Sequence, residues 1–250
     1  MTESVRISVI TACFNSEGTV RATIASVNAQ TYSNIEHVFI DGGSNDSTLD
    51  IISAEGRSGR SILSEADSGI YDALNKGLRR SDGDVIGFLH ADDFYAGDDV
   101  LARIATCFED PGIQAVYGDL QYVSHSNTAK IVRNWRTKPF SAGRLKRGWM
   151  PPHPALYIRK HWYNSIGGFD TSFRIAADYY SILQLFSDKE FRAVYIPEVL
   201  VRMRLGGESN RSLKNIIQKT REDYSALTRT GVGGVGTLVA KNLRKLGQFF

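Results

Sequence analysis

The chain has 250 residues, 42% of them hydrophobic, and a formal net charge of +3 at pH 7. This length and composition suit one large domain, or a domain with an appendage, and are ample to bury a core. No run approaches the roughly 18 consecutive apolar residues of a membrane span, and the polar start predicts no secretory signal, so we expect a cytoplasmic protein. Cys13 and Cys107 lie in apolar segments, which indicates buried hydrophobes rather than a disulfide framework.

Strands and helices alternate through the first half of the chain. In chain order, the pattern predicts a strand at 7–13, a helix at 19–30, a strand at 35–40, a short helix up to residue 52, a strand at 61–65, a helix at 70–80 and a strand at 84–89. Such alternation is typical of a Rossmann-like parallel sheet with crossover helices.

The pattern changes after Asp98. A helix up to Phe108 is followed by two strands of a hairpin-like insert, at 115–123 and 130–135, and by the proline-rich loop 149–154. Helices are then predicted at 159–165 and 177–186, with a strand at 192–196.

Acidic side chains follow two of the apolar strands. Asp41 comes at the end of one strand, and Asp92 and Asp93 come shortly after another. The carboxyl ends of parallel strands meet at one edge, where open α/β sheets bind ligands. Carboxylates suit a divalent cation such as Mg or Mn, and such a cation often shares its ligand sphere with phosphates. A nucleotide diphosphate is therefore the first ligand to consider, although a turn at Asp41 and a helix cap at Asp92 would leave the same pattern.

Two glycine motifs bear on phosphate binding. Residues 231–236 satisfy the dinucleotide pattern G-x-G-x-x-G, but they join two helical stretches instead of following a strand, so we interpret them as a flexible joint. The chain has no G-x-x-x-x-G-K-[ST] sequence, which excludes a P-loop.

Several motifs occur in an order that resembles a known family. They are Ser8-Val9-Ile10-Thr11 with Phe14-Asn15, the run from Ile40 to Thr48, the run from Ser64 to Gly77, and the run from Gly83 to Asp93. Together they resemble family 2 glycosyltransferases of the GT-A fold, in a bacterial branch associated with surface polysaccharides. The resemblance implies an α/β fold with a mostly parallel central sheet flanked by helices, and a C-terminal helical extension. We expect a GT-A domain at 1–205, with a nucleotide-sugar half at 1–125 and an acceptor half at 126–205.

The resemblance also implies roles for individual residues. The residues expected to contact the nucleotide-sugar donor, with a UDP-sugar as the expected substrate, are Thr11, Asn15, Asp41, Asp67, Asn75, Lys76, Asp92 and Arg204. Asp92 matches the metal-binding acid of the family's D-x-D element, and His90 replaces the first acid of that element. His90 could bind the metal directly, through water or not at all. The family usually has a second acid where this chain has Gly42.

Inverting transfer to a hydroxyl group needs one general base. Asp178, in the run Ala176-Ala177-Asp178-Tyr179-Tyr180, matches the family's base, and a plain helix cap is the structural alternative. His153 and Asp93 are the expected acceptor contacts; for His153 a position in a surface loop is the alternative. For Asn75 and Lys76 the alternative is an exposed helix face without a ligand. For the arginines at 202 and 204 the alternative is a solvated surface.

Residues 206–250 form a basic tail. From Leu200 onward there are ten Lys and Arg residues against three acids, which gives +7 there and −4 elsewhere. Apolar residues recur at helical spacing between the basic ones, which suits a helix lying on an anionic membrane or one packed on the domain. We favour the membrane, because lipid-linked saccharides are the usual acceptors of this branch. Few aromatic residues interleave with the basic ones, so no nucleic-acid partner is expected.

The sequence therefore predicts an inverting, metal-dependent glycosyltransferase that moves a sugar from a nucleotide diphosphate donor to a saccharide or lipid-linked acceptor. Its place would be the cytoplasm, peripherally at the inner face of the plasma membrane. Two alternatives stay open, namely a nucleotidyltransferase that makes a sugar nucleotide and a non-catalytic nucleotide-sugar binding protein. The former normally has a glycine-rich basic loop after the first strand, and Thr11 to Gly18 lacks one.

Overall fold

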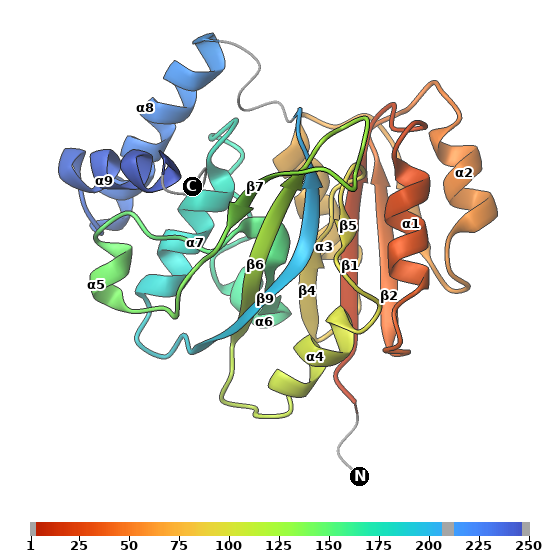
Figure 1. Cartoon of the computed structure of the whole chain (residues 1–250), viewed down its shortest axis with the longest axis horizontal. Helices are drawn as coiled ribbons and strands as arrows, with labels where there is room; N and C mark the ends of the chain where they lie inside the picture. The colour runs from red at the N-terminus through yellow and green to blue at the C-terminus, as the bar shows by residue number, and fades with distance from the viewer. Residues whose placement is uncertain (1–3, 207–212, 247–250) are drawn as a thin grey trace.

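The computed structural model describes residues 4–206 and 213–246. The predicted alternation of strands and helices in the first half is confirmed (Figure 1). The strands there are β1 (Ile7–Cys13), β2 (Ile35–Asp41), β3 (Ser61–Ser64) and β4 (Val85–Phe88). The helices are α1 (Val20–Asn28), α2 (Thr48–Glu55) and α3 (Ile70–Arg80). β1 pairs in parallel with β2 and β4, and β2 pairs in parallel with β3, so the carboxyl ends of these strands share one edge.

The second half extends the same sheet with mixed polarity. Its strands are β5 (Phe94–Tyr95), β6 (Ala115–Val123), β7 (Ile131–Trp135), β8 (Leu156–Arg159) and β9 (Ala193–Arg204). Its helices are α4 (Val100–Cys107), α5 (Ala142–Leu145), the 3-10 turn η1 (His153–Ala155), α6 (Lys160–Ser165) and α7 (Ala177–Ser187). The strand order is β3-β2-β1-β4-β8-β6-β9-β5, with β7 on β6. β8 is antiparallel to both β4 and β6, so the expectation of a mostly parallel sheet describes the first half better than the second.

Three strands differ from the sequence prediction, and the two-residue β5 is one that was not predicted. β8 was not predicted, because its four residues follow directly on the proline-rich loop. β9 was expected to end at Ile196, since the next residue is Pro197, yet it continues to Arg204. Ile196 lies opposite Gly118 and Val199 opposite Asp119, so the register shifts at the proline. A bulge is where a strand tolerates a residue without an N–H group.

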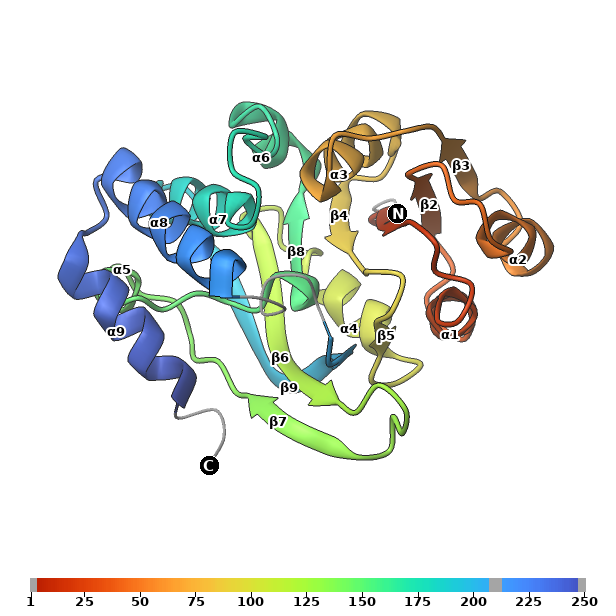
Figure 2. The same ribbon diagram turned by 90° about the horizontal axis from the view of Figure 1, so that it is seen from above.

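The helices cover both faces of the sheet (Figure 2). One apolar cluster joins β1, β2, β4 and β6 to α3, α6 and α7, and it includes Phe88, Tyr117 and Phe186. A second cluster joins the opposite face to α4, and it includes Val116 and Phe108. Because β4 carries buried side chains in both clusters, its carboxyl end is fixed from both sides.

The described part of the tail contains two helices, α8 (Leu213–Thr230) and α9 (Val235–Leu246). α8 packs along α7, and Ala226 and Leu227 of α8 are fully buried in the core. Lys241 of α9 pairs with Asp223 of α8, with its Nζ 2.6 Å from Asp223 Oδ1 and both side chains almost fully buried. The inner faces of the tail helices are therefore part of the folded body.

Membrane-spanning character is not found in the described residues: none of their helices combines enough length with enough apolar character to cross a bilayer. The two cysteines are free, as expected. Burial, followed by the charge of Asp41, raises the pKa of Cys13 to about 12, so this thiol stays protonated at neutral pH.

Candidate active site

The carboxyl end of β2 is closed by a turn around Asp41. Asp41 Oδ2 accepts hydrogen bonds from the N–H groups of Gly43 (3.1 Å) and Ser44 (3.0 Å) and from the Ser64 hydroxyl (2.6 Å). Asp41 has no exposed surface. The structure therefore places Asp41 as the anchor of the loop after β2, which is the turn alternative left open by the sequence.

Asp67 lies next to this turn, in the loop after β3. A Cβ atom at Gly42 would lie 2.6 Å from Asp67 Oδ2 and 3.5 Å from the Phe14 ring. The Gly69 N–H holds the other carboxylate oxygen of Asp67 at 2.8 Å. Gly42, which departs from the family's pattern, thus provides the space that the Asp67 carboxylate fills. Phe14 is 62% exposed beside it, so a carboxylate and an aromatic ring both border Gly42, and the surface between these two side chains is here called the opening.

The loops after β1 and β2 are bonded to each other. The Asn15 N–H donates to Ser44 Oγ (2.8 Å), and Asn15 Oδ1 accepts from the Asn45 N–H (3.0 Å). Asn15 has a φ of 47°, a left-handed conformation that asparagine tolerates better than most residues. Three further cross-loop bonds join Ser16 to Thr48, Glu17 to Asp46, and Ser47 to Glu17. Asn15 therefore shapes the rim of the opening through its backbone and its amide.

Three predicted donor contacts on β1 and α3 have protein partners instead. Thr11 is fully buried, with its hydroxyl 3.0 Å from His37 Nε2. The Asn75 amide bonds the Phe169 backbone twice, accepting from its N–H and donating to its carbonyl, both at 2.8 Å. Lys76 donates to the Ala66 carbonyl at 2.8 Å. Burial removes Thr11 from contact with a ligand. The two bonds of Asn75 use one of its two N–H groups and one lone pair of its oxygen, so its contact with the donor stays a prediction.

Lys76 supports the Asp67 loop. Besides the Ala66 carbonyl, its ammonium lies 2.9 Å from Glu65 and 3.5 Å from Asp72. The hydrogen bond to Glu65 is the largest cause that raises the pKa of Lys76. Lys76 thereby fixes the segment that carries Asp67.

The carboxyl end of β4 carries His90, Asp92 and Asp93. Arg204, the last residue of β9, donates from Nη1 to the Asp92 carbonyl (2.5 Å), and its backbone N–H donates to Asp93 Oδ1 (3.3 Å). Its guanidinium carbon lies 5.2 Å from the centre of the Phe94 ring. Arg204 thus ties the end of β9 to the acidic turn, and it brings a cation beside Asp92.

Asp93 differs sharply from its neighbour. It is fully buried, and its Oδ2 has no hydrogen-bond partner among the described residues. Burial, followed by the charge of Asp92, raises its pKa well above the usual range. Asp93 has no exposed surface with which to contact an acceptor, so the structure does not bring it to the place that the sequence interpretation gave it.

Asp178 lies in the first turn of α7. The Tyr71 hydroxyl of α3 is 3.0 Å from Asp178 Oδ1. Burial, followed by the charge of Asp178, raises the pKa of Tyr71 well above its usual value. The phenol therefore stays protonated, and its O–H group donates a hydrogen bond to the Asp178 carboxylate. Tyr71 was not predicted, because its distance from Asp178 along the sequence hides the contact.

His153 lies between Asp178 and the end of β4. Its ring stacks on Phe88 with the centroids 5.2 Å apart, and it is 6% exposed. Burial lowers the pKa of His153 to about 4, while the charge of Asp178 opposes this shift and His90 adds to it. His153 is therefore neutral at physiological pH and belongs to the interior floor of the site, not to a surface loop.

The residues at the end of β4 have the donor chemistry of a metal site but only part of its ligands. The partly exposed Asp92 carboxylate and His90 imidazole have no hydrogen-bond or ion-pair partner in the described chain. No group of three or more potential metal ligands exists within the described residues. A carboxylate suits Mn or Mg when the remaining positions are filled by phosphate and water, whereas an imidazole is a softer donor that Mg does not prefer. The residues present thus fit a cation that arrives with a diphosphate.

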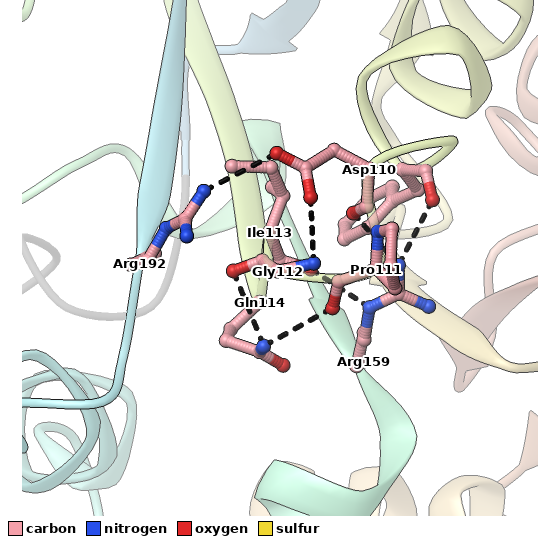
Figure 3. A network of polar contacts seen from close by, with 8 residues as sticks. Asp110, Pro111, Gly112, Ile113, Gln114, Arg159 and Arg192 are labelled. Atoms are coloured by element: carbon pink, nitrogen blue, oxygen red, sulfur yellow. Dashed lines mark hydrogen bonds and ion pairs between the residues drawn. The ribbon is translucent and has the colours of Figure 1, made fainter.

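A hollow with a volume of about 500 Å³ lies at the opposite edge of the sheet, at the amino end of β4. Its cations are already engaged. Arg159 donates to the carbonyls of Ile113 (2.7 Å) and Phe108 (2.9 Å), within the polar network around Asp110 (Figure 3). Lys160 donates to the Ser81 carbonyl. We therefore place the functional site at the carboxyl edge, where charged groups remain available.

Comparisons with solved structures show the same fold. A mannosyltransferase from Pyrobaculum calidifontis, solved with GDP-Man and Mn²⁺, aligns with a TM-score of 0.69 and 19% identity, covering 99% of this chain and 72% of its own. A fragment of S. aureus TarS in complex with UDP aligns with a TM-score of 0.66 and 16% identity, covering 89% of this chain. The chain spans 65% of that TarS fragment. The predicted GT-A-like fold is confirmed.

Sequence comparisons give the family. Residues 8–175 match the family described as glycosyl transferase family 2. An uncharacterized glycosyltransferase of Mycobacterium tuberculosis (strain CDC 1551 / Oshkosh) is 34% identical over 187 residues, which cover 74% of this chain and 70% of the relative. A PGL/p-HBAD biosynthesis glycosyltransferase of Mycobacterium bovis (strain BCG / Pasteur 1173P2) is 31% identical over 211 residues, covering 81% and 78%. The chain therefore belongs to glycosyl transferase family 2 and is a glycosyltransferase enzyme.

Proposed function

We propose that this glycosyltransferase takes its sugar from a nucleoside diphosphate donor, with a UDP-sugar as the first candidate. The neighbouring structures were solved with UDP, UDP-GlcNAc and GDP-Man, which supports this donor class. The opening between Phe14 and Asp67 supports it too, because an aromatic face and a carboxylate suit a flat base with N–H groups. The bonded loops at Asn15 and Asp41 would frame the ribose.

The diphosphate would lie at the end of β4. In this proposal Asp92 and His90 would hold a Mn or Mg ion, and Arg204, which bonds the Asp92 carbonyl, would add a second positive charge to the same turn. A divalent cation there would offset the negative charge that develops on a departing diphosphate. The Arg204 guanidinium suits phosphate oxygens as well, because its fork of N–H groups matches their geometry.

Asp178 is the proposed general base, and its bond to Tyr71 is the observation that carries the proposal. The acceptor hydroxyl oxygen attacks the anomeric carbon as the carbon–oxygen bond to the diphosphate breaks, and the hydroxyl proton passes to the Asp178 carboxylate. Attack on the face opposite the leaving group inverts the anomeric centre. Tyr71 fixes one carboxylate oxygen at 3.0 Å, which leaves the other for the incoming proton. Residues 126–205, which include neutral His153, would form the acceptor half.

A saccharide or lipid-linked acceptor is proposed, with the tail touching the cytoplasmic face of an anionic membrane. The outer faces of α8 and α9 expose large apolar side chains, namely Ile216, Ile217, Tyr224, Val235, Val239 and Leu243. Basic residues such as Lys214 and Arg244 flank them. An apolar stripe bordered by cations is typical of helices that lie in the membrane interface. Sedimentation with phosphatidylglycerol vesicles but not phosphatidylcholine vesicles, lost in Val239→Asp/Leu243→Asp, would support this contact.

The central experiment separates donor binding from turnover. Calorimetric titration with UDP, GDP, CMP and dTDP, each with and without Mn²⁺, identifies the preferred nucleobase and the metal requirement. Asp178→Asn should keep the wild-type nucleotide affinity but lose at least about 100-fold in nucleoside diphosphate release. Asp92→Asn should lose the Mn²⁺-dependent part of the affinity. Full turnover in Asp178→Asn would overturn the assignment of the base, and the absence of nucleotide binding in the wild type would overturn the donor class.

A further inference from the structure

Glu222, on the tail helix α8, holds the backbone that leads into α7. Its Oε2 accepts hydrogen bonds from the N–H groups of Ile175 (2.7 Å) and Ala176 (2.9 Å), and its Oε1 accepts from that of Arg174 (3.1 Å). Gln218, one turn earlier on α8, donates to Oε1 at 3.0 Å. One carboxylate thus receives three consecutive backbone donors at the amino end of α7, where a helix leaves such groups unpaired.

The same peptide segment is held from the other side by Tyr71. The Tyr71 hydroxyl lies 2.7 Å from the Ile175 carbonyl and 3.0 Å from Asp178 Oδ1, so its single proton is shared between them. Residue 175 is therefore bonded to Glu222 through its N–H and to Tyr71 through its carbonyl. A shift of this segment would move both the backbone before Asp178 and the hydroxyl that orients the Asp178 carboxylate.

Further contacts from the tail converge on the same region. Arg229 of α8 reaches Asp170 at 3.2 Å and lies 4.8 Å from the centre of the Phe173 ring. The Lys241 ammonium of α9 lies 3.2 Å from the centre of the Tyr179 ring, next to Asp178 in the sequence. The tail thus contacts the segment that precedes α7 as well as the first turn of α7 itself.

From these contacts we propose that Glu222 is a positioning residue for the general base, acting through the 174–176 segment and Tyr71. The inference rests on the proposed role of Asp178. In this proposal the tail helps to position the acceptor side of the active site, and this role is independent of any contact between the outer face of the tail and a membrane. Glu222 itself touches no reacting atom.

The test measures steady-state turnover with soluble acceptors, together with nucleotide affinity. Glu222→Gln should lower kcat by about 10- to 100-fold, since loss of fixed geometry at a reacting group costs on this order. The KM for the donor and the UDP affinity should stay within twofold, because the proposed donor contacts follow β1, β3 and β4 or end β9, and none of them belongs to α8 or to the 174–176 segment. Glu222→Asp should recover part of kcat. Arg221→Gln, an exposed neighbour on the same helix, should behave as wild type in this assay.

A double variant distinguishes positioning from general loss of structure. In an Asp178→Asn background, Glu222→Gln should cause no further loss, because the group it positions is already absent. Multiplicative losses, or an equal fall in nucleotide affinity, would overturn the inference in favour of a purely structural role. Wild-type kcat in Glu222→Gln would overturn it as well. Full turnover in Asp178→Asn would instead show that the proposed base is wrong.

Discussion

Replacing Gly42 with alanine should weaken donor binding without weakening the fold. The new methyl would lie 2.6 Å from Asp67 Oδ2, whereas ordinary contact begins at 3.4 Å, so the carboxylate must move by about 0.8 Å. The atom that must move is the end of a flexible side chain, and Gly42 does not have a positive φ, so the backbone accepts alanine. The free energy of unfolding should therefore change by less than about 1 kcal/mol.

The affinity should change much more. If Asp67 bonds the nucleotide base, a carboxylate displaced by this distance loses a charged hydrogen bond that is worth about 1.5–3 kcal/mol. This loss corresponds to a Kd raised about 10- to 150-fold. Calorimetric titration of the preferred nucleoside diphosphate measures it directly, with thermal unfolding run on the same samples.

Two control variants make this prediction sharp. Gly18→Ala places a methyl where no atom lies within 4 Å, so its affinity should match the wild type. In an Asp67→Ala background, Gly42→Ala should cost nothing further, because the clashing carboxylate is gone. Wild-type affinity in the single Gly42→Ala variant, with its fold intact, would refute the reasoning that Asp67 contacts the donor.

Further predictions concern buried charges. Asp223→Asn leaves the Lys241 ammonium buried without its partner and should cost about 3–5 kcal/mol in the free energy of unfolding, visible in urea denaturation at pH 7; a cost below 1 kcal/mol would contradict this. The deficit should shrink as the pH rises towards 8 and stay constant above it. Burial lowers the pKa of Lys241 to about 8 in the wild type, and the loss of Asp223 lowers it further, so only the variant's folded state gives up this proton below pH 8. Burial also lowers the pKa of His37 to about 3 and that of His153 to about 4, so between pH 6.5 and these values the unfolded chain binds more protons than the folded one. Near pH 5, these two histidines together should lower the free energy of unfolding by up to about 3 kcal/mol for each unit by which the pH falls. His37→Gln should remove about half of this pH dependence, as measured by urea unfolding at pH 5 and 7. An unchanged pH dependence would contradict the assignment.

The order of elements could be predicted from the sequence because it depends on local signals. Apolar runs and their spacing gave β1, β2, α3 and β6 nearly to the residue. The end of β9 could not be predicted in this way, because a proline such as Pro197 normally indicates that a strand ends. Only the pairing with β6 shows that the proline falls at a register shift.

The site was predictable in location but not in detail. The acids at the ends of β2 and β4 could be placed from chain order alone, since parallel strands bring their carboxyl ends together. Burial decides the rest. Thr11 and Asp93 have no exposed surface, and the Asn75 amide bonds the backbone of Phe169. The role of Glu222 could not be predicted, because the backbone N–H groups that it binds lie 46 to 48 residues away along the chain and no sequence pattern connects them to it.

The bonded loops after β1 and β2 have a consequence for engineering the enzyme. Bonds such as those from Asn15 to Ser44 and Asn45 order the rim of the opening before any nucleotide arrives. The entropy of ordering these residues is lost during folding instead of during binding, which favours tight and rapid capture. A change of base preference should therefore be sought at Phe14 and Asp67, which face the opening, while the interlocked polar residues behind them are kept as a rigid frame.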